Sequence, residues 1–370
     1  MATFNTKYST RGGFNTRVLA NVRGPPELVQ ALADMLNCGV AANTWRSYKT
    51  AARHVERIQR DLGIRLSFPM SVEDMLTYVG YLRNVRKVSG ATLDKYLSGL
   101  RMAHLTRGVF TPWTRPDILK LVVTGAQNRD QVIKRMAGKN GRLPVTPEMM
   151  RILRKGLSMS NLTTVKKRLL WLVASWCWSG AFRIHEILAR DRSSYDPTVT
   201  LMARDVTLSE VVVRGEEYKV VKVFLKHPKE ERLSAGVFID LFEVKGEASW
   251  LCPVMAYKKW KAEAGVILTG GKPLMRTKDS FNYTGANFNK DLKRFFGEEA
   301  ARGGGTISSH SFRAGLATAM SKANYSDEEI MAVGRWRSSA FLRYIKTPRE
   351  KRAMVAQELA GRMARMAICR

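Results

Sequence analysis

Hydrophobic residues recur every three or four positions along the first third of the chain, the period of a helix with one buried face. The clearest case lies near residue 50, where an apolar stripe runs beside a basic one. The apolar stripe consists of Trp45, Tyr48, Ala52, Val55 and Ile58, and the basic stripe of Arg46, Lys49, Arg53 and Arg57. Further helices are expected after Ser71, a favourable N-cap, and over residues 92–105. This region therefore predicts a compact bundle of four or five helices.

The pattern changes after residue 142. A strongly apolar helix is expected over residues 166–179, and Val-rich segments typical of strands follow it. These segments cover residues 199–202, 211–214, 219–226 and 236–239. Helical periodicity resumes at Ser249 and continues to the end of the chain. The expected fold class is mainly α with a small antiparallel β-sheet of about three strands, made of a helical domain followed by a mixed α/β domain.

Changes in composition predict the domain boundaries. Residues 1–26 are polar and read as a flexible basic arm. A helical domain is expected over 27–132, a basic linker with glycines over 133–144, and the second domain over 145–348. A helical tail is expected over 349–370.

The chain is strongly basic. Its 62 Lys and Arg residues stand against 32 Asp and Glu, which gives a formal net charge of +30 and a pI near 10.3. Such an excess is typical of nucleic-acid binding. A membrane surface would also attract it, but no apolar run approaches the ~20 residues that span a bilayer, and no signal peptide is recognisable. Four scattered cysteines and five histidines without an acidic cluster predict no metal, disulfide framework or other cofactor.

Cleavage of a DNA phosphodiester without a metal requires a nucleophile, cations for the non-bridging oxygens and a proton for the leaving 5′ oxygen. Suitable residue types occur in order along the chain. They are Arg183 with Glu186 three positions later, lysines near 226–229, His310 with Arg313 on one helix face, and Tyr344, 31 residues beyond Arg313. Each alone has a commoner explanation, such as a surface ion pair, a solvated lysine, a capping histidine or a packed tyrosine.

Together, the order and spacing resemble the tyrosine recombinase/integrase family, whose pattern is Arg, a hairpin-turn Lys, His-x-x-Arg, His or Trp, and Tyr. Two motifs are similar in sequence to recombinases of eukaryotic tyrosine-recombinase retroelements and related mobile elements. They are His-Ser-Phe-Arg-Ala-Gly and Gly-Arg-Trp-Arg-Ser-Ser-Ala-Phe-Leu-Arg-Tyr-Ile. The resemblance is strongest over about 145–348 and weaker over the helical region. It implies a core-binding domain followed by a catalytic domain, which form a C-shaped clamp on DNA.

The resemblance also implies the catalytic residues. These are Arg183, Glu186, Lys229, His310, Arg313, Trp336 or Arg335, and Tyr344. Many family members place His or Trp directly after the glycine of the third motif, a place that Arg335 holds here. Trp336 is slightly preferred for this role, and Arg335 stays open. Lys229 fits the turn better than Lys226, and His227 is a third candidate proton donor.

In the mechanism that the resemblance implies, Tyr344 forms a 3′-phosphotyrosine without metal or ATP. Four protomers on two specific recombination sites then exchange strands through a Holliday junction, with a monomer or dimer expected off DNA. The tail either exchanges between protomers or docks on its own domain. DNA contacts are expected from Arg46, Lys49, Arg53, Arg57, Lys95, Arg101 and Lys139.

Integration or excision of a mobile element is the expected role. The nucleus is the expected compartment for a eukaryotic element, and the cytoplasm or nucleoid otherwise. Two alternatives remain. A type IB topoisomerase uses the same tyrosine chemistry, although a histidine three positions before the arginine favours a recombinase. A catalytically inactive DNA-binding remnant of a mobile element would explain the charge.

Overall fold

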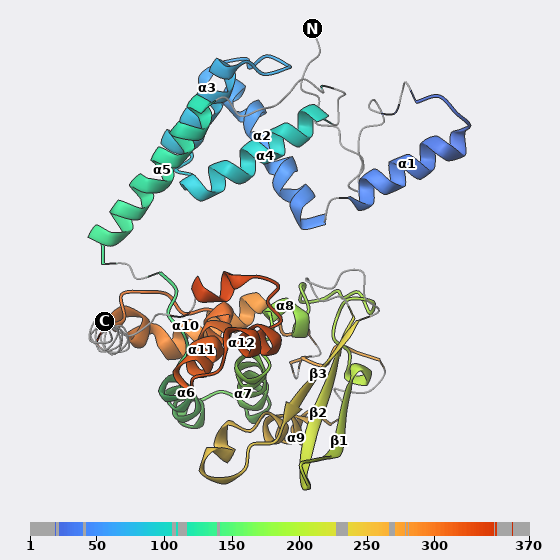
Figure 1. Cartoon of the computed structure of the whole chain (residues 1–370), viewed down its shortest axis with the longest axis vertical. Helices are drawn as coiled ribbons and strands as arrows, with labels where there is room; N and C mark the ends of the chain where they lie inside the picture. Colours follow the sequence, from blue (N-terminus) through green and yellow to red (C-terminus); the bar gives the residue numbers. More distant parts are fainter. Residues whose placement is uncertain are drawn as a thin grey trace, which may run out of the picture. The chain divides into compact units, whose positions relative to one another are not determined.

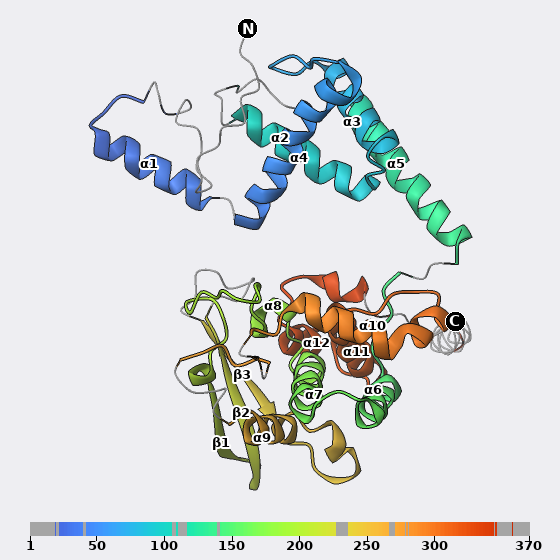
Figure 2. The same cartoon turned by 180° about the vertical axis from the view of Figure 1, so that it is seen from behind.

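The computed structural model describes residues 19, 22–39, 42–105, 109, 117–138, 141–226, 236–265, 271–277, 279, 281–343, 345 and 357. The chain divides into two compact units, Met1–Gly138 and Lys139–Arg370 (Figures 1 and 2). Each unit encloses a hydrophobic core of its own. None of the described helices is long and apolar enough to span a lipid bilayer.

The first unit is helical, as the periodicity predicted. Its helices are α1 (Pro26–Cys38), α2 (Ala42–Leu62), α3 (Val72–Asn84), α4 (Gly90–Leu105) and α5 (Asp117–Met136). Ser71 is the N-cap of α3, and its Oγ accepts a hydrogen bond from the Asp74 N–H at 3.1 Å. Helices α2 and α4 cross closely at Gly99, where a Cβ would lie 2.8 Å from the Ala51 Cβ. In the apolar stripe of α2, Tyr48 is half-buried and the other four residues are buried.

The second unit combines helices with one sheet. Its helices are α6 (Pro147–Met159), α7 (Thr164–Ser179), α8 (Ile184–Ile187), α9 (Pro253–Ala264), α10 (Gly285–Arg302), α11 (Ser309–Lys322) and α12 (Asp327–Gly334), with the 3-10 turns η2 (Ala203–Asp205), η3 (Gly246–Leu251) and η5 (Ser339–Arg343). Helix α7 is the centre of the core, and Leu169, Val173 and Trp176 on it are fully buried. After its basic first turns, α7 is apolar or buried on almost every side from Leu169 to Cys177, as expected of a helix surrounded by other elements.

The sheet has the strand order β1 (Val206–Val213), β2 (Glu216–Leu225) and β3 (Val237–Phe242), and both pairings are antiparallel. Arg214 and Gly215 connect β1 to β2 with φ of 52° and 83°. Two left-handed residues in a two-residue loop match the twist of the flanking strands, so this turn fixes the hairpin register. The predicted fold class, mainly α with a small three-stranded antiparallel sheet, is confirmed.

One local prediction was wrong. Residues 199–202 form no strand, because Asp205 Oδ2 accepts the Met202 N–H at 2.8 Å and closes the turn η2 there. The boundary between the two units lies after Gly138, inside the predicted linker 133–144. Parts of this linker are ordered, since α5 continues to Met136 and the N–H of Leu143 donates to the Thr306 carbonyl at 2.9 Å. Lys139, residues 1–18 of the predicted arm, and the predicted tail apart from Gln357 lie outside the described residues.

Gly315 permits the close approach of α11 to the start of the second unit. A Cβ at this position would overlap the carbonyl oxygen of Val145, which also accepts the Trp178 indole N–H at 3.1 Å. Gly297 in α10 offers a matched comparison, because nothing lies within 4 Å of a Cβ built there.

We expect Gly315→Ala to lower the free energy of unfolding by about 2–3 kcal/mol, because backbone must move to admit the methyl group. Gly297→Ala should raise it by about 0.5–1 kcal/mol through helix propensity. Thermal unfolding of both variants by circular dichroism measures the two effects. Equal shifts in the two midpoints would contradict the packing assigned to Gly315.

Candidate active site

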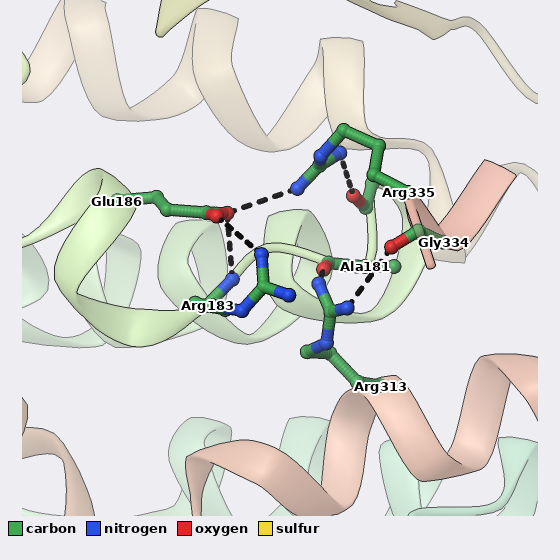
Figure 3. A network of polar contacts seen from close by, with 7 residues as sticks. Ala181, Arg183, Glu186, Arg313, Gly334 and Arg335 are labelled. Carbon is green, nitrogen blue, oxygen red and sulfur yellow. Dashed lines mark hydrogen bonds and ion pairs between the residues drawn. The ribbon is translucent and has the colours of Figure 1, made fainter. Parts of the chain in front are cut away.

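The predicted site residues come from three separate parts of the second unit. Arg183 directly precedes α8, and Glu186 lies within it. His310 and Arg313 lie in the first turns of α11, and Arg335 directly follows α12. Figure 3 shows the side chains of Arg183, Arg335 and Arg313 gathered around one short segment of chain. The structure therefore brings together residues up to 152 positions apart in the numbering.

Glu186 is the centre of this cluster. Its Oε1 accepts from Arg183 Nη1 at 2.9 Å, and its Oε2 accepts from Arg335 Nη2 at 2.9 Å and from the Arg183 backbone N–H at 2.8 Å (Figure 3). The side chains of Arg183, Glu186 and Arg335 are only 11%, 3% and 10% exposed. Burial by itself raises the pKa of Glu186, but Arg335 and Arg183 outweigh it and hold the pKa below its usual value.

Arg335 ends α12 in a left-handed conformation, with φ 54° and ψ 49°. This conformation is uncommon for a residue with a side chain. The guanidinium is anchored at both sides, because Nη1 donates to the Gly180 carbonyl at 3.0 Å while Nη2 reaches Glu186. Arg335 thus connects the end of α12 to the segment between α7 and α8.

Arg313 is buried and makes a parallel connection. Its Nη1 donates to the Ala181 carbonyl and its Nη2 to the Gly334 carbonyl at 2.9 Å. The guanidinium also lies over the Trp336 ring, with 4.9 Å between the guanidinium carbon and the ring centroid. Arg313 and Arg335 consequently both connect the segment after α7 to the end of α12.

The sequence Gly334-Arg335-Trp336 has a distinct structural reason at each position. A Cβ at 334 would overlap the ring of Trp336, so this place accommodates glycine alone. Arg335 reaches the carboxylate of Glu186, whereas Trp336 is buried and stacks near Phe341 at 5.8 Å between ring centroids. The structure therefore places Arg335 in the polar cluster and Trp336 in an apolar one.

The residues on both sides of Tyr344 belong to that apolar cluster. Phe341 is buried in it and Ile345 is packed against it, together with Leu316, Ile330 and Trp336. Tyr344 itself lies outside the described residues. The chain next to the predicted nucleophile is thus attached to the elements that carry Arg313 and Arg335.

His310 is half-buried among positive charges. Burial, and then the charges of Arg142, Arg313, His185 and Arg183, lower its pKa. Arg142 and His185 were not predicted as site residues. Arg142 was assigned to the linker, but its pairing with Thr306, just before α11, brings it near His310. The position of His185 between Arg183 and Glu186 was the available signal for that residue.

Of the two candidate lysines, Lys226 directly follows β2. Lys226 is 17% exposed and forms an ion pair with Asp205, and its Nζ also donates to the carbonyls of Pro197 at 2.8 Å and Thr200 at 3.1 Å. A cavity of about 90 Å³ lies between this lysine and Glu186. Lys229 and His227 lie outside the described residues. The three donor positions of Lys226 are thus directed to protein acceptors.

The sequence matches no protein-family model and no curated protein. Solved structures do resemble the fold. XerH site-specific recombinase bound to palindromic difH substrate, in a post-cleavage complex, has a TM-score of 0.56 at 12% identity, over 90% of this chain and 84% of that chain. The Tn1549 transposon integrase in complex with a circular intermediate DNA has a TM-score of 0.54 at 13% identity, over 86% and 94%.

The chain has the tyrosine-recombinase fold. This finding supports the resemblance seen in the sequence motifs. In this fold the polar cluster around Glu186 is formed by the residues that the motifs had indicated. Similarity to recombinases of eukaryotic retroelements stays a prediction. Within the described part of the chain, no group of three or more His, Cys, Asp and Glu residues is placed to hold a metal ion.

We expect Glu186→Gln to lower the free energy of unfolding of the second unit by about 3–5 kcal/mol, because two nearly buried guanidinium groups lose their counter-charge. Because the folded-state pKa of Glu186 is lowered, this stabilisation is present above the unfolded glutamate pKa of about 4.3 and is lost as the pH falls through the folded-state value. The difference between wild type and variant should therefore shrink in acid.

Calorimetry between neutral and acidic pH measures this difference. Glu299→Gln is the matched control, since Glu299 pairs with Arg302 at the same spacing but Arg302 is 73% exposed. Its effect should stay below about 1 kcal/mol. A Glu186→Gln variant as stable as this control would mean that the carboxylate is dispensable.

Proposed function

We propose that this chain is a site-specific DNA recombinase or integrase that cuts and rejoins DNA through a covalent tyrosine link. The observation that carries the proposal is the Glu186-centred cluster, because it unites Arg183 and Arg335 from two separate motifs inside a tyrosine-recombinase fold. Arg313 from the intervening motif lies against the same segment. An ordinary surface ion pair would require none of this convergence.

The proposed reaction is a phosphoryl transfer without a high-energy cofactor. The Tyr344 oxygen attacks the scissile phosphorus, a 3′-phosphotyrosine bond forms, and the bond to the 5′ oxygen breaks. Arginine suits the non-bridging oxygens because its planar fork matches phosphate and stays protonated. A 5′-hydroxyl then attacks the phosphotyrosine and releases the tyrosine. Since one phosphodiester replaces another, the bond energy is retained and ATP is not consumed.

The polar contacts support specific roles. Arg335 fits the third-motif role better than Trp336, because it shares Glu186 with Arg183 while Trp336 packs in the apolar cluster. Lys229 is favoured as general acid over Lys226, whose ammonium is engaged by Asp205. The lowered pKa of His310 keeps its imidazole neutral near pH 7, so it can donate one N–H to a phosphoryl oxygen and accept a proton elsewhere.

Double-stranded DNA with specific recombination sites is the proposed partner. In the first unit, Arg46, Arg53, Lys95 and Arg101 are exposed, while Lys49 and Arg57 are half-buried. Such cations neutralise phosphates irrespective of base sequence. The XerH and Tn1549 integrase structures contain DNA, which supports a duplex partner for this fold. We further propose a homo-tetramer acting through a Holliday junction, in the nucleus if the chain serves a eukaryotic mobile element.

A nicked duplex from the ends of the parent element tests the proposed chemistry. Without divalent metal, the wild-type protein should form a denaturation-resistant adduct that Tyr344→Phe does not form, since phenylalanine has no attacking oxygen. Both proteins should bind the duplex equally in gel shifts. An adduct with Tyr344→Phe would exclude this tyrosine, binding by both without an adduct would indicate an inactive remnant, and relaxation of plasmids without a defined site would favour a topoisomerase.

The third-motif assignment has its own test. We expect Arg335→Ala to reduce adduct formation about 100-fold or more, as expected for loss of a transition-state cation. Trp336→Phe keeps an aromatic ring in the apolar cluster and should reduce adduct formation by less than about fivefold. Single-turnover rates on the nicked duplex, with thermal midpoints as a folding control, separate the two. The reverse order of effects would restore Trp336 to this role.

A further inference from the structure

A second feature of the unit that carries Glu186 lies at the opposite end of α7. A groove of about 670 Å³ opens between α6, the start of α7, η3 and α9. We call it the Trp171–Trp250 groove, after the two tryptophans that line it. Helix α7 has 16 residues and a length of about 24 Å, with Lys167 near its first turn and Arg183 beyond its last. In Figures 1 and 2, α8 lies at the upper end of this unit and α9 at the lower end.

The groove has an apolar floor. Leu157, Cys252 and Ala256 are buried beneath it, and the two tryptophans are half-buried with 6.4 Å between their ring centroids. Guanidinium groups cover the indoles. Arg151 lies 5.0 Å from the Trp250 centroid, and Arg154 lies 6.0 Å from both centroids. The rings therefore hold both arginines in place. Arg151 Nη1 also lies 3.9 Å from Glu148 Oε1 in an exposed ion pair, whereas no carboxylate of the described residues pairs with Arg154. The N–H edge of Arg154 can thus meet an acceptor on a ligand.

The rim of the groove is positive. Its cations are Arg154, Lys167, Arg168, Lys245 and Lys259. One carboxylate, Glu243, also lines it, but its Oε1 accepts the Lys219 backbone N–H at 2.8 Å and so serves the sheet. The Nζ of Lys167 donates to the Ser158 carbonyl at 3.2 Å, and that of Lys245 to the Glu217 carbonyl at 2.8 Å. The Nζ of Lys245 also lies 4.2 Å from the Tyr218 ring centroid. Among the described residues, neither ammonium group forms an ion pair with a carboxylate.

We propose that the Trp171–Trp250 groove binds an acidic peptide segment of a partner protein, with an apolar side chain on the floor and carboxylates on the rim. Carboxylates of the peptide can accept hydrogen bonds from the guanidinium edges. The apolar floor favours a ligand that also carries an apolar side chain. A stacked nucleobase fits less well, because Arg151 and Arg154 already lie over the indole faces that it would need.

Two basic segments of this chain do not suit this groove. Residues 1–25 contain four Lys or Arg and no acidic residue, and residues 351–370 contain five Lys or Arg and one Glu. A basic segment in a basic groove is repelled, whether it comes from the same molecule or a second copy. The ligand that complements the rim is therefore an acidic segment, which we assign to a partner protein.

Fluorescence anisotropy at about 0.15 M salt tests this proposal with the full-length protein. The probe is a labelled peptide of Asp and Glu residues around a central Leu-Phe pair. The groove variant carries Arg168→Glu with Lys259→Glu. The control variant carries Lys155→Glu with Lys261→Glu, which makes the same charge change on α6 and α9 at exposed positions outside the groove lining.

We expect the groove variant to weaken peptide binding about tenfold or more and the control variant less than about threefold, because only the former removes charges that contact the ligand. Replacing the Leu-Phe pair of the peptide by Ser-Ser should also weaken binding. The phosphotyrosine assay should give equal adduct with both variants, which shows that they fold and separates this proposal from the proposed function.

Three results would overturn the proposal. If the peptide does not bind the wild-type protein, the groove is not a peptide-binding site. If both variants lose the same affinity for the peptide, the binding is general electrostatic attraction. Displacement of the peptide by single-stranded oligothymidine, with the same dependence on Arg168 and Lys259, would make the groove a nucleic-acid site.

Discussion

The carboxylate of Glu186 is the group on which the candidate site depends. A buried carboxylate loses several kcal/mol of hydration, roughly, and is retained only where opposite charge and hydrogen bonds offset that loss. Here Arg183 and Arg335 supply the charge and two of the hydrogen bonds, and a backbone N–H supplies the third. If one of these partners is removed, the remaining groups stay buried but lose a charge or hydrogen bond that offsets their lost hydration. The cluster is therefore a unit, and it connects the end of α7 to the end of α12.

The charge balance of the cluster explains its suitability for phosphate. Arg183, Arg313 and Arg335 contribute three positive charges, against one carboxylate. Arg313 is held by backbone carbonyls, which orient a guanidinium without neutralising it. The pKa of the nearby His310 is lowered mainly by burial, and the positive charges of Arg142, Arg313, His185 and Arg183 lower it further. An anion with several oxygens is the natural ligand of such a site.

The conformation of the backbone contributes as well. Ala181 and Arg335 have φ of 46° and 54°, although neither is glycine, and both lie where α7 and α12 end. Uncommon conformations persist where surrounding contacts determine them, and they concentrate at functional sites. The guanidinium of Arg313 bonds the carbonyl of Ala181 and that of Gly334, next to Arg335. Ala181 also belongs to the apolar cluster of Trp336 and Phe341, which packs against this region.

The sequence by itself determined what depends on neighbouring residues. Helical periodicity, the Ser71 cap, the Arg214-Gly215 hairpin and the placement of His310 and Arg313 on one helix all follow from local rules of spacing and conformation. Tertiary structure decided the rest. Arg335 and Trp336 are adjacent, and only the left-handed turn at Arg335 sends one side chain to Glu186, 149 residues away, and the other into the core. Likewise, Lys226 forms an ion pair with Asp205, and Thr306 forms backbone hydrogen bonds with Gly141 and Leu143. These partners are distant in sequence, so local patterns do not predict which of them satisfies a given charge or backbone group.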